Sequence, residues 1–173
     1  MQKEADKLPI QREAIATSLN GRMIFLNPAH TNIHLHVLEN PQILSLVKEV
    51  VEQSVLEGEN VAIEKDLGRV VGVTNCVTTD ESDDIIYAKR KKRDTFSRFV
   101  KNKQAQPTNF VTVILHEAED GYELWSAWCG QPVPMVRDSK GVLHGDKAFW
   151  ENHALLYDPE IIQPDTVSTV RPW

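Results

Sequence analysis

A run of basic residues between Tyr87 and Lys103 is the part of this sequence whose side chains are best suited to chemistry on a phosphate. The run holds eight of the chain's nineteen lysines and arginines, with Asp94 as its single acidic residue, so its local charge is +7. Because the whole chain has a formal net charge of −6, the remaining residues carry −13. A concentrated positive segment on an acidic protein is typical of a selective site for a polyanion. The alternative is a solvated strand edge whose lysines prevent aggregation.

Hydroxyl groups and aromatic rings follow the basic run. Side chains alternate between the two faces of a strand, so Arg93 and Thr95 share one face of a strand predicted over residues 85–100, and Ser126 belongs to a neighbouring strand. Arginine can bind a phosphate through two parallel hydrogen bonds, and a hydroxyl adds another without adding charge. We therefore expect these three side chains to surround a phosphate; the alternative for the two hydroxyls is ordinary sheet polarity. The other cations expected to contact nucleic acid are Lys89, Arg90, Lys91, Lys92, Lys101 and Lys103.

Six histidines are candidate proton carriers. Histidine titrates near neutral pH, so one ring can remove a proton from a ribose hydroxyl and another can return one to a leaving oxygen. His36 precedes the main predicted helix and His153 lies near the C-terminus; for each, a hydrogen-bonded or solvent-exposed ring is the alternative. The pair His34 and His36 lacks a third metal ligand that the sequence nominates, so we predict no metal site and no cofactor. The full set is His30, His34, His36, His116, His144 and His153.

The strongest periodic signal predicts a helix from Asn40 to Leu56. Asparagine caps the free amides at a helix start, and Pro41 suits the first helical position. A second helix is expected over Ile10–Leu19, within a weakly structured segment of residues 1–20. In the main helix the apolar residues recur every three or four positions and mark one buried face; they are Ile43, Leu44, Val47, Val50, Val51 and Val55.

After the main helix, the pattern changes to one that is typical of strands. Residues 61–130 predict a four-stranded antiparallel β meander, in which an acidic turn over residues 79–84 joins the first two strands. A C-terminal helical segment over Lys147–Leu156 and an extended tail over residues 158–173 follow. The predicted fold class is α+β, with one main amphipathic helix packed on the meander, in a single domain over residues 1–173. The four strands are expected over residues 68–77, 85–100, 109–116 and 122–128.

Composition narrows the class of protein. A chain of 173 residues with 41% hydrophobic residues and four tryptophans can bury one core. It lacks an apolar stretch of the roughly 18 residues that a membrane span needs, and its first residues lack the apolar part of a secretory signal, so we expect a cytoplasmic protein without membrane contact. Cys76 and Cys129 have no metal-ligand spacing and are expected to be reduced, packed thiols; a disulfide is the alternative.

The order of these parts resembles the superfamily of small ribonuclease toxins that includes barnase, the tRNA-cutting colicins, RelE-like toxins and their phage-associated relatives. The similarity covers residues 34–130. It consists of a histidine-bearing helical segment, the segment Arg93–Val100 in the meander, and the segment Leu124–Trp128. The resemblance implies metal-independent cleavage of RNA, in which the adjacent 2′-hydroxyl attacks and a cyclic phosphate remains.

The resemblance also implies a role for individual side chains. His36 would act as base or acid. Arg93 and Arg98 would stabilise the phosphorane, and Thr95 and Ser126 would hold phosphate oxygens. With His153 as a further proton carrier, these six residues form the expected catalytic set.

Three functions therefore stay open. The first is a metal-independent endoribonuclease or toxin-like domain acting on RNA. The second is a module that binds nucleic acid through the same basic segment without catalysis. The third is an immunity or adaptor-type protein, whose acidic remainder would contact a partner. RNA is the expected ligand, and a toxin of this kind would also have a neutralising protein partner.

Overall fold

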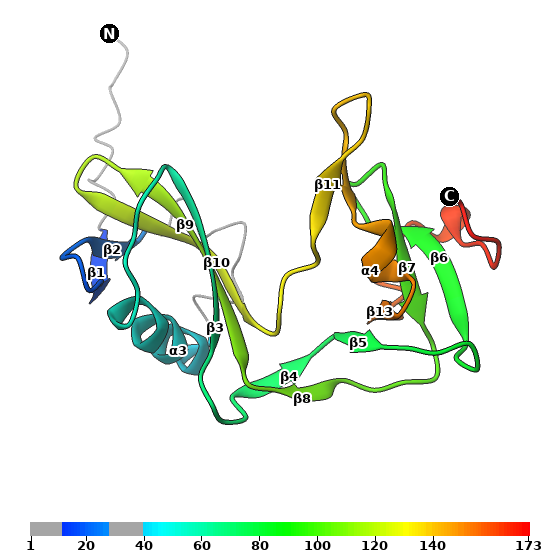
Figure 1. Cartoon of the computed structure of the whole chain (residues 1–173), viewed down its shortest axis with the longest axis horizontal. Coiled ribbons are helices and arrows are strands. Elements are labelled where there is room, and N and C mark those ends of the chain that lie inside the picture. Colours follow the sequence, from blue (N-terminus) through cyan, green and yellow to red (C-terminus); the bar gives the residue numbers. More distant parts are fainter. Residues whose placement is uncertain (1–11, 28–39) are drawn as a thin grey trace, which may run out of the picture. The chain divides into compact units, whose positions relative to one another are not determined.

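The computed structural model of the chain describes residues 12–27 and 40–173 (Figure 1). The described part is mostly β, with 44% strand, 13% helix, thirteen strands and a single helix of seven or more residues. The predicted α+β class, with a helix on a four-stranded meander and a C-terminal helical segment, is therefore wrong. Within the described residues, no helix is long and apolar enough to cross a membrane.

The chain divides into two compact units, and each is discontinuous in sequence. Unit 1 consists of Met1–Val71 and Asn109–Cys129, and unit 2 consists of Gly72–Thr108 and Gly130–Trp173. Each unit has its own buried apolar residues. The single-domain organisation over residues 1–173 stays a prediction, since interleaved segments of this kind are compatible with one folding unit.

Unit 1 is built on a five-stranded sheet with strand order β1-β2-β10-β9-β3. The pair β2 and β10 is parallel, and the other neighbours are antiparallel. Gly121 at the start of β10 lies against the backbone of Met23, where any Cβ would collide with the carbonyl oxygen of Met23. The strands are β1 (Glu13–Thr17), β2 (Met23–Leu26), β3 (Asn60–Asp66), β9 (Phe110–Ala118) and β10 (Gly121–Cys129).

The helix predicted over Ile10–Leu19 is wrong where the structure describes the chain. Glu13–Thr17 forms strand β1, which pairs with β2 across a turn at Asn20 and Gly21. Gly21 has a φ of 76°, a conformation that glycine adopts at little cost. The hydrogen bonds that this short segment would make within a helix are therefore made to a neighbouring strand instead, and pairing overrides the weak helical signal.

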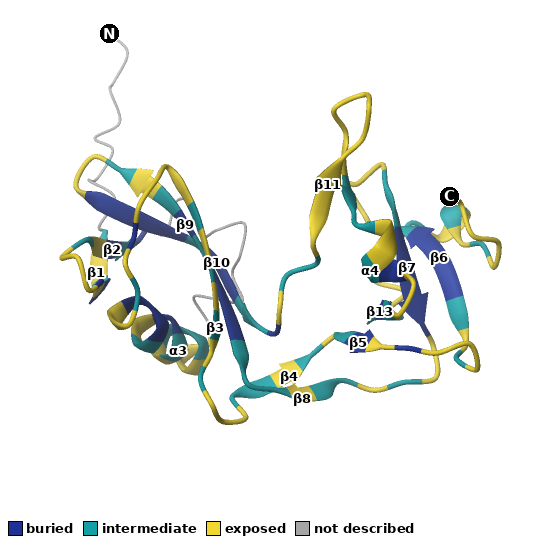
Figure 2. Cartoon of the chain, in the orientation of Figure 1, coloured by how far each residue is buried: buried dark blue, intermediate teal, exposed yellow. Residues whose placement is uncertain are grey.

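The main predicted helix is confirmed as α3 (Pro41–Glu52), although it ends four residues before Leu56. The side chain of Asn40 accepts hydrogen bonds from the amides of Gln42 at 3.0 Å and Ile43 at 3.4 Å. This cap satisfies two of the four amides that lack a partner at a helix start. The inner face packs in one cluster with apolar residues of the sheet, and each fully buried valine stabilises the fold by about 1.5–3 kcal/mol (Figure 2). Its buried members are Val47, Val50 and Val51.

Unit 2 contains a four-stranded sheet with strand order β5-β13-β7-β6 and two two-stranded ribbons. The strands of the sheet are β5 (Cys76–Thr78), β6 (Ile85–Lys89), β7 (Phe96–Val100) and β13 (His153–Leu156). The ribbons pair β4 (Gly72–Thr74) with β8 (Gln106–Thr108), and β11 (Met135–Arg137) with β12 (Leu143–Gly145).

The single long strand predicted over residues 85–100 is wrong, because the chain reverses within it. Strands β6 and β7 form an antiparallel pair in which Lys89 lies opposite Phe96. Residues 90–95 make the turn, and Lys92 there has a φ of 62°. Consecutive cations on a continuous strand would put alternate charges into the core, whereas the turn leaves Lys91, Lys92 and Arg93 exposed to water.

The meander and the C-terminal helix are wrong for a shared reason. Strand β5 pairs with β13 rather than with β6, and β13 also pairs in parallel with β7. Residues 153–156 therefore form a central strand in which Ala154 is fully buried. Only α4 (Lys147–Trp150) is helical in the segment 147–156, after a cap by Asp146.

The extended tail over residues 158–173 belongs to the fold of unit 2. Ser168 exchanges two backbone hydrogen bonds of 2.8 Å with Tyr87 of β6. Ile162 is 2% exposed and packs with Ile86, Ala88 and Phe99. A short 3₁₀ helix, η2 (Pro164–Thr166), lies between these two contacts.

Candidate nucleic-acid-binding site

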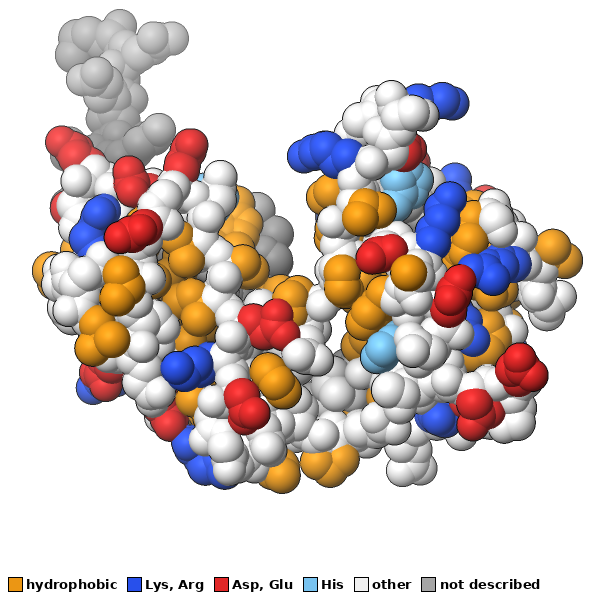
Figure 3. All heavy atoms as spheres, viewed as in Figure 1, with side chains coloured by type: hydrophobic (Ala, Val, Ile, Leu, Met, Phe, Trp, Pro, Cys, Tyr) orange, Lys and Arg blue, Asp and Glu red, His pale blue; other side chains and the backbone are white. Residues whose placement is uncertain are grey.

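The end of β6 and the turn that follows it carry five consecutive cations, Lys89–Arg93, which we call the basic loop. Lys91, Lys92 and Arg93 are exposed, and Lys89 and Arg90 are partly buried. Across residues 12–27 and 40–173, no ion pair neutralises any of the five. Several lysine and arginine side chains stand close together over the region of β6 and β7 in unit 2 (Figure 3). The basic loop therefore presents uncompensated positive charge.

The backbone of the basic loop is held by the tail. One amide group, that of Gln163, donates to the carbonyl oxygens of Arg90 and Arg93, each at 2.9 Å. The amide of Lys89 donates to the hydroxyl of Thr166 at 2.9 Å, and the amide of Lys91 donates to a carbonyl of the tail at 2.9 Å. These bonds fix the loop before any ligand arrives, so less ordering remains to be done on binding.

Among the five loop cations, Arg90 has the surroundings that disfavour a positive charge most. Burial, followed by the neighbouring charge of Arg93, lowers the pKa of Arg90. Its Nε atom is buried and has no hydrogen-bond partner among the described residues. An unpaired buried donor costs about 1–3 kcal/mol, so Arg90 is held in this position at a cost to stability.

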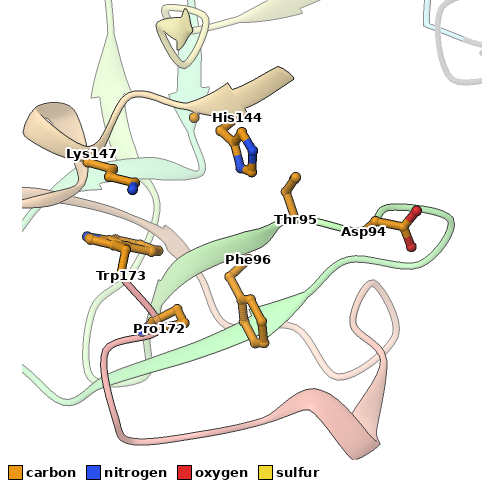
Figure 4. Close-up of a pocket in the computed structure, with 8 residues that line it drawn as sticks. Asp94, Thr95, Phe96, His144, Lys147, Pro172 and Trp173 are labelled. Carbon is orange, nitrogen blue, oxygen red and sulfur yellow. The ribbon is translucent and has the colours of Figure 1, made fainter. Parts of the chain in front are cut away.

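A surface pocket of about 170 Å³ adjoins the basic loop (Figure 4). It is formed by the start of β7, the segment from β12 to α4, and the end of the tail. The ammonium group of Lys89 lies 5.3 Å from the centre of the Phe96 ring, which connects the loop with the pocket. The lining residues are Asp94, Thr95, Phe96, His144, Gly145, Lys147, Pro172 and Trp173.

His144 is the histidine of the pocket, and Asp138 orients it. Its Nε2 atom lies 2.6 Å from a carboxylate oxygen of Asp138, in the turn between β11 and β12. The amides of Val142 and Lys140 also donate to Asp138, and these bonds together with His144 lower the pKa of Asp138, with Val142 contributing most. An ionised Asp138 accepts a hydrogen bond from the Nε2–H group, and in that tautomer the neutral ring has Nδ1 as its proton acceptor.

Two residues of the expected catalytic set lie at this site. Thr95 lines the pocket, and Arg93 belongs to the basic loop two positions earlier. In Figure 4 the side chains of Thr95 and His144 lie on the same part of the pocket, whereas the Lys147 chain lies beside Trp173.

Two further residues of the expected catalytic set, Arg98 and His153, make hydrogen bonds and a ring contact within unit 2. Arg98 is 8% exposed and donates to the hydroxyl of Thr79 and, at 3.0 Å, to the carbonyl oxygen of His153. The His153 ring stacks on Phe149 at 4.1 Å, and its Nδ1 atom lies 2.7 Å from the side-chain oxygen of Asn152. Neither residue lines the pocket. These contacts are those of structural residues that join β7, β13 and α4.

The remaining expected catalytic residues lie elsewhere. Ser126 is a buried residue of β10 in unit 1, whereas Thr95 belongs to unit 2. His36 lies outside the described residues.

The two cations at the far end of β7 are set apart from the basic loop. The Lys101 ammonium lies 5.0 Å from the centre of the Tyr157 ring. Lys103 is 3.2 Å from a carboxylate oxygen of Asp83 and donates to the Thr78 carbonyl oxygen at 2.8 Å. Lys103 is therefore already neutralised by a carboxylate.

Sequence reasoning missed Lys147 and Trp173, and placed His144 only among six candidate histidines. His144 belongs to β12 and Thr95 to the turn before β7, and these segments are distant in sequence and do not pair in a sheet. The only local sign was a turn at Gly141 shortly before His144, which does not predict proximity to residue 95.

Neither a metal site nor a disulfide accompanies the pocket in the part of the chain that the structure describes. No group of three or more His, Cys, Asp or Glu side chains lies together there in a way that could hold a metal ion. Cys76 and Cys129 are both free thiols, and burial raises the pKa of Cys76 to about 11. At neutral pH the Cys76 thiol is therefore protonated and unreactive.

No family model, no curated protein and no solved structure matches the chain. The resemblance to small ribonuclease toxins therefore stays a prediction.

Proposed function

We propose that this protein binds RNA through unit 2, with the basic loop holding the phosphodiester backbone beside the pocket. The observation that carries the proposal is the basic loop itself: five consecutive cations, none of them ion-paired within the described chain. Unpaired cations on a fixed backbone attract phosphate groups without first breaking an internal ion pair.

The burial of Arg90 supports the same function. A partly buried guanidinium beside a second cation, Arg93, is stabilised when the negative charge of a phosphate lies nearby. A loop that served only to keep β6 soluble would place its charges fully in water instead.

A titration of fluorescent RNA at several salt concentrations tests the proposal. The variant Lys91→Gln/Lys92→Gln/Arg93→Gln removes three exposed charges of the loop. It should bind about a hundredfold more weakly at about 0.1 M salt, and its logarithmic salt slope should be shallower by about 2. The matched control Lys48→Gln/Lys65→Gln/Arg69→Gln removes the same charge from unit 1 and should leave both quantities nearly unchanged. Equal losses in the two variants would mean that only net charge matters and would contradict the proposal.

A second candidate function, metal-independent cleavage of the bound RNA, is favoured by the His144–Asp138 pair in the pocket. Nδ1 of His144 would take the proton of a 2′-hydroxyl. The freed O2′ would then bond to phosphorus while the P–O5′ bond breaks, and the departing O5′ would take a proton from the Lys147 ammonium group. The products would be a 2′,3′-cyclic phosphate and a 5′-hydroxyl.

Cleavage and binding are separated by one experiment. Total RNA is incubated with the wild type and with His144→Asn in the presence of a chelator. Cyclic-phosphate ends that form with the wild type and not with His144→Asn would establish the second function. RNA that is bound and stays intact would leave binding as the function of unit 2.

A further inference from the structure

We propose that the pocket takes an unpaired nucleobase, which stacks on the indole of Trp173, so that the ligand of unit 2 is single-stranded RNA. This inference rests on the proposed function, because the phosphate groups of the same strand would lie on the basic loop. Beyond RNA binding, it specifies that the RNA is single-stranded and that the base is the part of the nucleotide that enters the pocket.

Trp173 is held as a platform at the pocket. Its ring meets the Tyr87 ring at a right angle, with centroids 5.3 Å apart and planes at 89°, and the guanidinium of Arg171 lies over the indole, 5.5 Å from its centroid. Neither Tyr87 nor Arg171 lines the pocket, whereas Trp173 does. The indole Nε1 atom is buried, so the pocket meets the carbon surface of the ring rather than its N–H group. A fixed aromatic surface with no exposed donor favours stacking.

The rest of the pocket matches a base that carries a phosphate. The ring of Phe96 and the ring of Pro172 supply further apolar surface, and Asp94 and Thr95 supply groups that accept or donate hydrogen bonds. Figure 4 shows the indole nearly edge-on, with the chain of Lys147 on one side of it and Phe96 and Pro172 on the other.

A paired base does not meet these requirements. In a duplex both faces of each base are covered by its neighbours, so a base reaches an aromatic platform only when it is unstacked. The pocket of about 170 Å³ is small and belongs to one unit, which suits a single base rather than a groove of a helix.

The test compares two strands with the same phosphates. One is a single-stranded RNA of about ten nucleotides, and the other is the corresponding abasic strand, which keeps the backbone and lacks the bases. The wild type should bind the RNA about tenfold more tightly than the abasic strand, since each stacked base contributes this order of affinity. Trp173→Leu should lose that difference and keep the salt slope. Trp173→Phe, which keeps an aromatic ring, should retain part of the difference.

Each outcome separates this inference from the proposed function. Equal binding of both strands by the wild type would overturn the stacking site and leave backbone binding in place. Binding of neither strand would overturn the proposed function itself. Preference for duplex RNA of the same sequence would also overturn the inference. Thermal unfolding of each variant shows that unit 2 is folded, and Phe96→Leu serves as the second variant if Trp173→Leu is unfolded.

Discussion

In unit 1 most described cations lie against carboxylates, whereas in unit 2 the five cations of the basic loop have no such partner. The sequence of unit 1 holds seven Lys and Arg and fourteen Asp and Glu, a formal charge of −7, and that of unit 2 holds twelve and eleven, a charge of +1. Because positive and negative residues are nearly balanced in unit 2, net charge does not explain the unpaired loop. Asp94 follows Arg93 directly, but neither it nor any other described carboxylate forms an ion pair with the loop.

The cations of unit 1 connect segments that are distant in sequence. Arg12 lies 2.9 Å from a carboxylate oxygen of Asp120 and 3.1 Å from one of Glu123, and its guanidinium covers the ring of Phe25 at 4.1 Å. Asn27 donates to the same buried carboxylate of Glu123 at 3.1 Å. These contacts hold β1, β2 and β10 together, so the charges of unit 1 stabilise the fold and those of the basic loop are available for a ligand.

Supplying the basic loop with carboxylates should have the largest effect. In Lys91→Glu/Lys92→Glu two cations are lost and two neighbours gain an acidic partner, so roughly four phosphate contacts disappear and RNA affinity should fall roughly five-hundredfold at about 0.1 M salt. The matched control is Lys48→Glu/Lys65→Glu in unit 1. If both variants lose affinity to the same degree, the distinction between the units does not hold.

Removing an ion-paired cation of unit 1 should destabilise the fold, whereas removing an exposed cation of the basic loop should not. Arg12→Ala leaves Glu123 without its ion pair and should lower the free energy of unfolding by about 2 kcal/mol. Arg93→Ala removes an exposed, unpaired side chain and should change it by no more than about 0.5 kcal/mol. Urea unfolding measures both. A large loss with Arg93→Ala would show that the loop has a structural role.

Gln163 should link the fold of the tail with binding by the basic loop. Gln163→Leu removes two hydrogen bonds to loop carbonyls and should lower the free energy of unfolding by about 1–2 kcal/mol. RNA affinity should fall severalfold, because the loop is then ordered only on binding. Gln104, which is exposed and lies outside the site, provides the control Gln104→Leu. Unchanged RNA affinity in Gln163→Leu would mean that the loop does not need this support.

The smallest expected effect is the pH dependence of the stability that the Asp138 carboxylate contributes to the folded protein. Hydrogen bonds lower the pKa of Asp138 below its ordinary value, so its ionised form stabilises the folded protein above that ordinary value. The contribution is lost as the pH falls through the lowered pKa. The stability difference between wild type and Asp138→Asn should therefore be constant near neutral pH and shrink below about pH 4. A difference that persists at the acidic limit would assign it to packing instead.

Local signals were sufficient for some elements. Asn40, Pro41 and the regular spacing of Val47, Val50 and Val51 predicted α3, because capping and periodicity act within a few turns. The strands over residues 109–116 and 122–128 were also predicted, and they form the β9–β10 hairpin. Long-range pairings were not predicted, because β13 lies between β5 and β7, which are distant from it in sequence.

The sequence by itself determined that the chain carries a concentrated basic segment, since the order of lysines and arginines along the chain is the same in any fold. Only the tertiary structure decided that this segment is a turn whose backbone is held by Gln163. It also decided that Thr95 meets His144 and Trp173 in a pocket, while Arg98 is buried among structural contacts and Ser126 lies in the other unit. The physical reason is that side-chain type is local, whereas the neighbours of a side chain depend on strand pairings between distant segments.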